Sequence, residues 1–227
     1  MRHLFNGQWP DTALFDLDGT LVDSAPDLAT AIDAMLEATG RQPVGADRVR
    51  GWVGNGAQVL VKRALAGQFD YQTGTPFSDD DFQHALTLFF DTYSDMNGRL
   101  SSVYAGVEPF LKALVAENVR LGVVTNKPTA FTGPLLEKMD LHHWFKVSVC
   151  GDTLPVKKPD PEQIYHAVEA LGGDMARTLM VGDSINDIQA AQRAGVPVVA
   201  VRYGYNYGGN IDDAGADIVV DSLVELL

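Results

Sequence analysis

The sequence predicts an α/β protein built on a doubly wound parallel sheet, with an all-helical unit inserted after the first strand. From residue 104 onward, short apolar segments alternate with helical segments of about 10–15 residues, the rhythm of strands and helices in such sheets. A buried strand is predicted at residues 13–15, and the next convincing strand begins about 100 residues later. Because a βαβ unit closes within about 30 residues, the excess predicts an insertion.

Residues 24–100 are expected to be helical, without a convincing strand. One helix should start at Ser24, with Pro26 in its first turn, a second should contain residues 59–65, and a third should open at Ser78. The predicted domains are an α/β core of residues 1–23 plus 103–227 and a helical domain of residues 24–102. The later elements are expected in strict alternation: helices at 107–117, 130–139, 161–171 and 185–194 and at the C-terminus, and strands at 120–125, 146–150, 178–181, 197–201 and 217–220.

Composition narrows the classes of function. The 227 residues carry a formal net charge of -13 and 46% hydrophobic residues, typical of a globular chain. A nucleic-acid binder would show a basic surface, so nucleic acid is an unexpected partner. The single Cys150 excludes an intrachain disulfide, and no segment has the apolar length of a membrane span or a signal peptide. We therefore expect a cytoplasmic protein without a membrane partner, as a monomer or a homodimer.

The first predicted strand ends on two carboxylates. Asp16 and Asp18 point the same way if the extended conformation persists, at the edge where open α/β sheets bind ligands. Two like charges so close need a counter-ion or a shared proton, and Mg²⁺ suits carboxylate and carbonyl oxygens. A solvated Asp-x-Asp-Gly turn is the alternative.

Three later strands end on further polar side chains. Thr125 and Asn126 could hold a phosphate or simply cap the next helix. Lys157 and Lys158 precede another predicted helix and could reach the strand ends or remain solvated. Asp183 follows a buried strand, where a carboxylate is costly unless it is solvated, paired or metal-bound. Asp187 completes a capping pattern with Ser184.

The order of these motifs, each at its own strand end, resembles that of the haloacid dehalogenase superfamily. The motifs are Asp-x-Asp-Gly-Thr, Thr125, Lys158-Pro159 and Gly-Asp-x-x-x-Asp. The resemblance covers the whole chain. It implies a Rossmann-like core, with residues 24–102 as a helical cap that closes over the strand ends and governs the choice of substrate.

The resemblance also implies roles for the site residues. Asp16 would be the nucleophile that forms an aspartyl-phosphate, and Asp18 the general acid and base. Mg²⁺ would be bound by Asp16, the backbone carbonyl of Asp18 and Asp183, with Asp187 orienting these ligands. The transferring phosphoryl group would be held by Thr125 and Asn126, and Lys158 would offset its charge.

Within the superfamily the sequence is most similar to the phosphoglycolate phosphatases. The similarity rests on three segments, residues 15–24, 53–57 and 203–206. It implies a small phosphorylated metabolite as the substrate, 2-phosphoglycolate first, in carbohydrate metabolism. Asn55 is the expected cap contact, with Arg63 or Lys62 as partner for a substrate carboxylate. The adjacent His142 and His143 receive no role, because neighbouring residues do not share a helix face.

Three alternatives to a phosphoglycolate phosphatase remain at this stage. The chain could hydrolyse another small sugar phosphate, or interconvert sugar phosphates as a phosphomutase. From a different class, it could be a phosphoacceptor or metal-binding regulatory module that keeps the phosphoryl group on Asp16. Asp18 and the helical insertion argue against the module, which needs neither.

Overall fold

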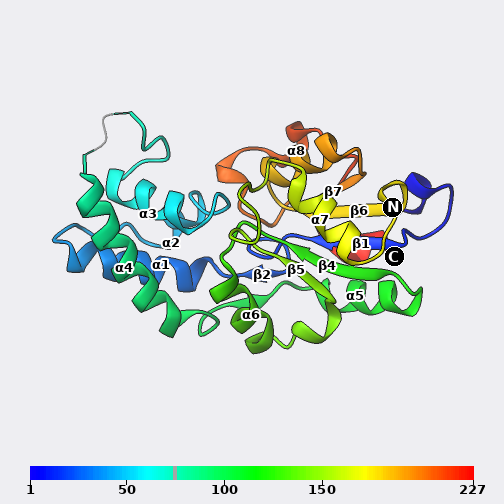
Figure 1. Cartoon of the computed structure of the whole chain (residues 1–227), viewed down its shortest axis with the longest axis horizontal. Coiled ribbons are helices and arrows are strands. Elements are labelled where there is room, and N and C mark those ends of the chain that lie inside the picture. Colours follow the sequence, from blue (N-terminus) through cyan, green and yellow to red (C-terminus); the bar gives the residue numbers. More distant parts are fainter. Residues whose placement is uncertain (74–75) are drawn as a thin grey trace.

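A six-stranded parallel sheet forms the centre of the larger part of the molecule (Figure 1). The computed structural model describes residues 1–73 and 76–227. The strand order is β5-β4-β1-β6-β7-β8, and every hydrogen-bonded pair of neighbours in it is parallel. The strands are β1 (Thr12–Phe15), β4 (Arg120–Val124), β5 (Val147–Val149), β6 (Thr178–Gly182), β7 (Val198–Val201) and β8 (Ile218–Val220).

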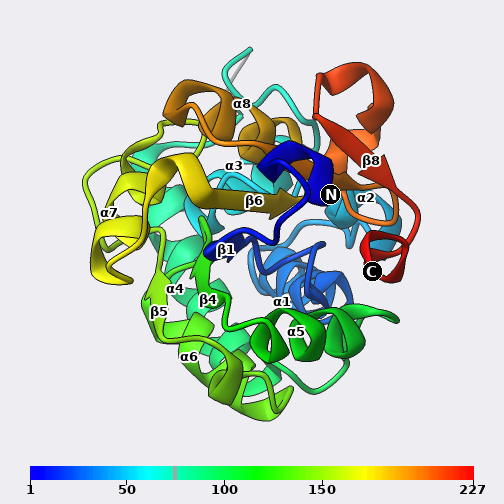
Figure 2. The same ribbon diagram turned by 90° about the vertical axis from the view of Figure 1, so that its right-hand side faces the viewer.

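Helices cover both faces of this sheet, as the near-continuous apolar strands require. Phe15 packs toward α5 (Val107–Ala116) and α6 (Thr129–Lys138), while Leu14 packs toward α7 (Glu162–Ala170) and α8 (Ile185–Ala194). Figure 2 shows α5 and α6 on one side of the strands and α7 and α8 on the other. The doubly wound parallel sheet predicted from the sequence is confirmed.

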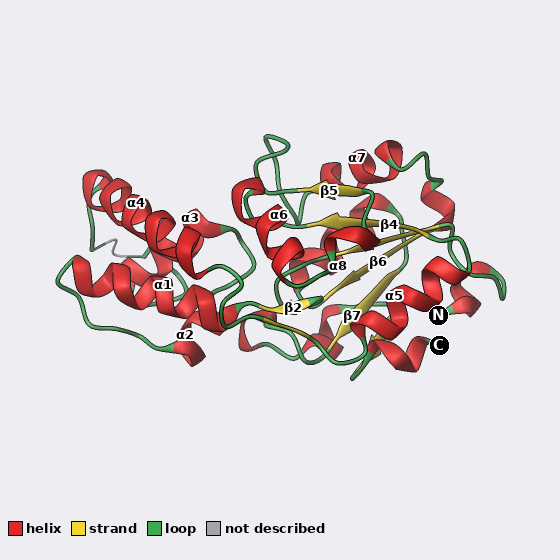
Figure 3. Ribbon diagram, turned by 90° about the horizontal axis from the view of Figure 1, so that it is seen from below, coloured by secondary structure: helices red, strands yellow, loops and turns green. Residues whose placement is uncertain are grey.

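The other four α-helices of the described residues lie together beyond the carboxyl ends of the strands (Figures 1 and 3). They are α1 (Ala25–Ala38), α2 (Ala46–Arg50), α3 (Ala57–Ala66) and α4 (Asp79–Met96), and they share one hydrophobic cluster. The predicted start at Ser78 is confirmed, because its hydroxyl and the Asp81 carboxylate form a capping box at α4. Ser24 occupies the N-cap of α1 but its side chain makes no cap bond. It donates to Asp18 instead. The predicted helix start at Ser24 is confirmed, but a cap hydrogen bond from its side chain is absent.

Two short strands were not predicted. The segments β2 (Val22–Asp23) and β3 (Ser102–Val103) pair antiparallel, so the chain enters and leaves the four helices at one place. The predicted C-terminal helix is a 3-10 turn. The 3-10 helices of the described residues are η1 (Arg2–Phe5), η2 (His142–Trp144), η3 (Met175–Arg177), η4 (Asn206–Gly208), η5 (Ile211–Ala214) and η6 (Leu223–Leu226). None of the helices described is both long enough and apolar enough to cross a membrane.

Candidate active site

The carboxyl ends of three adjacent strands bring the predicted polar residues together. Asp16 directly follows β1, Thr125 follows β4 and Asp183 follows β6, and the sheet order places β4, β1 and β6 side by side. The parallel ladder continues past β1 and β4, since Asp16 N–H donates to Val181 and Thr125 N–H donates to Val149. Asp183 N–H instead donates to Asp187 Oδ2. The sheet therefore holds the backbone of Asp16 and Thr125, and the turn into α8 holds that of Asp183.

Three buried carboxylates gather at this edge. Oxygen atoms of Asp16, Asp183 and Asp187 lie within 4.8 Å of one another. Burial raises the pKa of Asp16 to about 7, although Lys158 opposes the shift, and burial with the charges of Asp187 and Asp16 raises the pKa of Asp183 well above its usual value. Such a cluster is stable in its ionised form only with positive charge beside it.

Lys158 provides one of these positive charges. Its ammonium lies 2.9 Å from Asp16 Oδ1 and 2.6 Å from Asp187 Oδ1, and donates to the Val124 carbonyl at 2.6 Å. Although burial lowers the pKa of Lys158, the two carboxylates raise it, to about 12. When all are ionised, three carboxylates and one ammonium leave two negative charges, which a divalent cation would neutralise.

The donor set fits Mg²⁺. Carboxylate and carbonyl oxygens are the ligands this cation prefers, and Asp16, Asp183 and the Asp18 carbonyl would supply them. Asp183 is fixed by the Thr20 hydroxyl at 3.0 Å and by the Tyr205 N–H at 2.7 Å. The sequence interpretation did not identify these two donors. The only indication in the sequence was that Thr20 and Tyr205 lie in the segments 15–24 and 203–206, on which the family resemblance rests.

Asp187 holds the turn between β6 and α8. Its Oδ2 accepts hydrogen bonds from Ser184 N–H, Ser184 Oγ and Asp183 N–H, at 3.0, 2.7 and 3.2 Å. The capping box predicted with Ser184 is therefore confirmed. Because the other oxygen accepts from Lys158, Asp187 links the helix start to the charged cluster.

Asp18 faces a different lysine from Asp16. Lys127 Nζ lies 3.1 Å from Asp18 Oδ1 and donates to the Tyr93 hydroxyl at 2.6 Å. Lys127 is buried at the end of β4, directly after Thr125 and Asn126. The sequence interpretation passed over it, although its place in the Thr-Asn-Lys-Pro segment at a strand end was a usable signal.

A pocket lies between the sheet edge and the four helices. Its wall includes Asp16, Asp18, Thr125 and Lys127 from the sheet side and Tyr93 from α4. The cavity is small, about 40 Å³. The pocket therefore suits a small molecule.

Comparison with known proteins identifies the family of this chain. A family model described as haloacid dehalogenase-like hydrolase matches residues 10–195. The chain belongs to the haloacid dehalogenase-like hydrolases.

Curated relatives cover nearly the whole chain. It is 47% identical to a phosphoglycolate phosphatase of Pseudomonas putida, over 100% of this chain and 82% of that protein. It is 43% identical to one of Nitrosococcus oceani, over 96% of this chain and 95% of that protein. Among solved structures, a predicted phosphoglycolate phosphatase from Haemophilus somnus matches with a TM-score of 0.88 and 36% identity, over 95% and 96% of the two chains.

In this haloacid dehalogenase-like hydrolase, two of the expected phosphate contacts already have partners. The Asn126 amide donates to the carbonyls of Gly54 and Lys158, both at 2.9 Å, and its oxygen accepts from Lys158 N–H. Thr125 Oγ1 accepts from Lys127 N–H at 3.2 Å, and both Thr125 and Asn126 line the pocket. The Asn126 side chain therefore joins the sheet edge to the helical unit, a role the sequence interpretation did not foresee.

The two expected cap contacts do not line this pocket. Arg63 is buried, donates to the Trp52 and Phe69 carbonyls at 2.6 and 3.2 Å, and stacks on the Phe69 ring. Asn55 and Arg63 border a separate shallow groove. The structure therefore does not bring either residue to the carboxylates, because Arg63 is committed within the helical unit.

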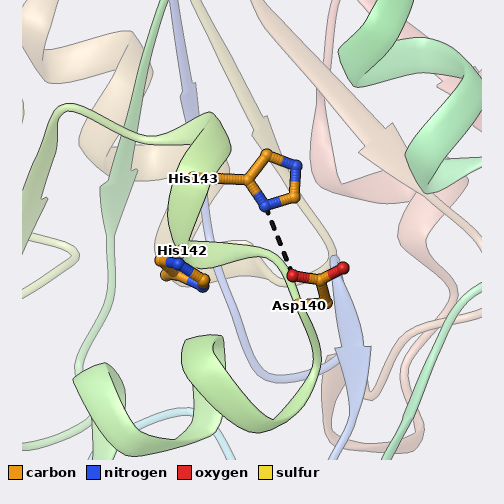
Figure 4. Close-up of side chains that lie close together, drawn as sticks. All are labelled: Asp140, His142 and His143. Carbon is orange, nitrogen blue, oxygen red and sulfur yellow. Dashed lines mark ion pairs between the residues drawn. The ribbon is translucent and has the colours of Figure 1, made fainter.

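A second group of metal-type ligands lies elsewhere. Asp140, His142 and His143 are exposed, and His143 Nδ1 lies 3.5 Å from Asp140 Oδ1 (Figure 4). They precede β5, so they lie toward the amino ends of the parallel strands, away from the edge that carries Asp16. This group does not take part in the pocket.

The glycine at position 204 should be needed for metal binding. A Cβ there would overlap the side chain of Asp183. We expect Gly204→Ala to weaken Mg²⁺ binding by roughly 10–100-fold, as changes that support metal ligands do, in calorimetric titrations. Gly133→Ala is the control, because a Cβ at Gly133 in α6 meets nothing within 4 Å. Equal Mg²⁺ affinity in both variants would show that Asp183 is not a ligand.

Proposed function

We propose that this hydrolase is a Mg²⁺-dependent phosphatase that cleaves small phosphomonoesters, with 2-phosphoglycolate as its first substrate. One observation carries the proposal: Asp16 lies at the pocket wall beside Lys158 and within 4.8 Å of Asp183 and Asp187. The names of the curated relatives support the choice of substrate, as does the small pocket. A cytoplasmic location remains a prediction, and so does the division into residues 24–102 as the cap and the rest as the core.

The residues divide the reaction into two transfers. In the first, an Asp16 oxygen forms a bond to phosphorus, the ester P–O bond breaks, and the leaving alkoxide takes a proton from Asp18. In the second, Asp18 takes a proton from water, the water oxygen bonds to phosphorus and the Asp16–phosphorus bond breaks. When bound, Mg²⁺ would offset negative charge on the phosphoryl oxygens.

Electrostatic positioning supplies most of the catalysis in phosphoryl transfer. Lys158 is fixed by three oxygen acceptors, so its charge needs no reorientation during the reaction. The apolar side chains of Leu28, Val53 and Phe89 line the pocket from the helical side and exclude water from the reacting groups.

A phosphate-release panel tests the proposal. Purified protein with Mg²⁺ should release phosphate from 2-phosphoglycolate and from few larger sugar phosphates or nucleotides. Removal of the metal with EDTA should abolish release, and added Mg²⁺ should restore it. Isomerisation of a phosphosugar with little phosphate release would instead identify a phosphomutase, and stable phosphorylation without turnover a regulatory module.

A further inference from the structure

We propose that Lys127, held by Tyr93, recognises a carboxylate on the substrate and thereby selects phosphate esters of small hydroxy acids. The proposal rests on the phosphatase function proposed above and assigns the specificity of that site. It places the selecting cation in the loop after β4, whereas the sequence analysis expected Arg63 or Lys62 in the helical segment.

Lys127 lies at the right place for a second anionic group. It follows Thr125 by two residues at the end of β4, and both residues line the pocket together with Asp16 and Asp18. Its Nζ is 3.1 Å from Asp18 Oδ1, so it lies beside the residue proposed to protonate the ester oxygen. A carboxylate joined to the ester oxygen through one carbon would therefore fall near this ammonium.

The charges around the pocket leave an incoming carboxylate one partner. Among the described residues that line it, Lys127 is the one with a cationic side chain. Lys158 is not in this wall, and its ammonium is already bound by Asp16, Asp187 and the Val124 carbonyl. The remaining wall is largely apolar, from Leu28, Leu60 and Phe131. A charged group that met only this wall would lose its hydration without compensation.

Tyr93 fixes the ammonium from the opposite side. Its hydroxyl accepts from Lys127 Nζ at 2.6 Å, and its ring stacks on Phe89 and meets Phe131 edge-on, with centroids 5.4 and 4.9 Å away. A lysine ammonium has three hydrogens. Tyr93 accepts one, and the two Asp18 oxygens lie 3.1 and 3.4 Å from Nζ. A substrate oxygen would replace the longer contact, to Asp18 Oδ2, so recognition joins the loop after β4 to α4.

The competing cations lie outside this pocket. Arg63 is committed to the Trp52 and Phe69 carbonyls. Lys62 Nζ lies over the rings of Tyr71 and Phe82, 5.7 and 4.7 Å from their centroids. Lys157 Nζ lies near Gly56, 3.4 Å from where a Cβ would be placed there. None of these three residues is part of the pocket wall, so Lys127 is the residue to test.

The test compares 2-phosphoglycolate with ethyl phosphate, which has the same two-carbon ester skeleton without the carboxylate. The wild-type protein should prefer 2-phosphoglycolate by at least about 100-fold in kcat/KM, the range for a buried charge pair. In Lys127→Met, kcat/KM for 2-phosphoglycolate should fall by at least about 100-fold, while that for ethyl phosphate falls no more than about tenfold. The preference should therefore collapse.

Two further variants make the result independent of the folding of Lys127→Met. Tyr93→Phe retains the ring packing and should reduce the preference roughly tenfold, because one hydrogen bond to a charged group is lost. Lys112→Met, on the exposed side of α5, should leave the preference unchanged. Circular dichroism checks that each variant is folded.

Two outcomes would overturn the inference alone. One is a wild-type protein that hydrolyses both esters equally well, and the other is a Lys127→Met protein that loses activity on both in the same proportion. In either case the phosphatase function stands. A wild-type protein that hydrolyses no phosphomonoester would overturn the proposed function and this inference together.

Discussion

Replacing Asp16 with asparagine is expected to reduce phosphate release by at least about 10⁴-fold, the scale seen when a catalytic nucleophile is removed. An amide keeps the shape of the side chain and an oxygen to accept from Lys158, which lies 2.9 Å from Asp16 Oδ1. It lacks the anionic oxygen that would bond to phosphorus. Phosphate release with saturating Mg²⁺ measures the effect, and circular dichroism checks the fold.

The matched control is the same change at the other end of the same strand. Asp11 precedes β1 and pairs with Arg177 at 3.1 Å, near the surface. Asp11→Asn should leave kcat/KM within about twofold, as surface substitutions away from a site do. A folded Asp16→Asn protein that retains wild-type activity would exclude Asp16 as the nucleophile.

The second large effect is expected at Lys158. In the metal-free protein, Lys158→Met should lower the free energy of unfolding by roughly 3–5 kcal/mol, since removing one partner of a buried ion pair leaves uncompensated charge. The Asp16 and Asp187 carboxylates would lose their shared cation, and the Val124 carbonyl would lose its donor. Urea unfolding at pH 8 measures the stability, and phosphate release should fall as well.

The neighbouring lysine provides the comparison. Lys157 is half-buried, and no ion pair joins it to a carboxylate in the described part of the chain. Lys157→Met should change the free energy of unfolding by no more than about 1 kcal/mol. Equal destabilisation by the two substitutions would contradict the assignment of the buried cation to Lys158.

The fold could be predicted from the sequence where an element is long enough for its hydrophobic periodicity to appear. The helix expected at 185–194 is α8, because apolar residues recur with helical spacing and Ser184 and Asp187 mark the start. The strands β2 and β3 have two residues each, too few for any alternation to appear. Their pairing depends on contacts between segments about 80 residues apart, which local patterns do not contain.

Some features of the candidate site could likewise be predicted from the sequence, and others could not. The positions of Asp16 and Asp183 could be expected, because each follows an apolar strand and the parallel topology brings those ends to one edge. The bond between Lys127 and Tyr93 could not, since it depends on how α4 lies over the sheet. The sequence of the loop around Gly54 likewise does not show on which side of it Asn55 lies.

The central claim is that Asp16 carries the phosphoryl group during turnover, and chemical trapping tests it most directly. Protein mixed with 2-phosphoglycolate and Mg²⁺ is quenched in acid and reduced with borohydride, which converts an aspartyl-phosphate to homoserine. The account predicts homoserine at position 16 in the peptide that contains β1, in wild type and not in the Asp16→Asn variant. Phosphate release without any homoserine at position 16, or trapping at another carboxylate, would contradict it.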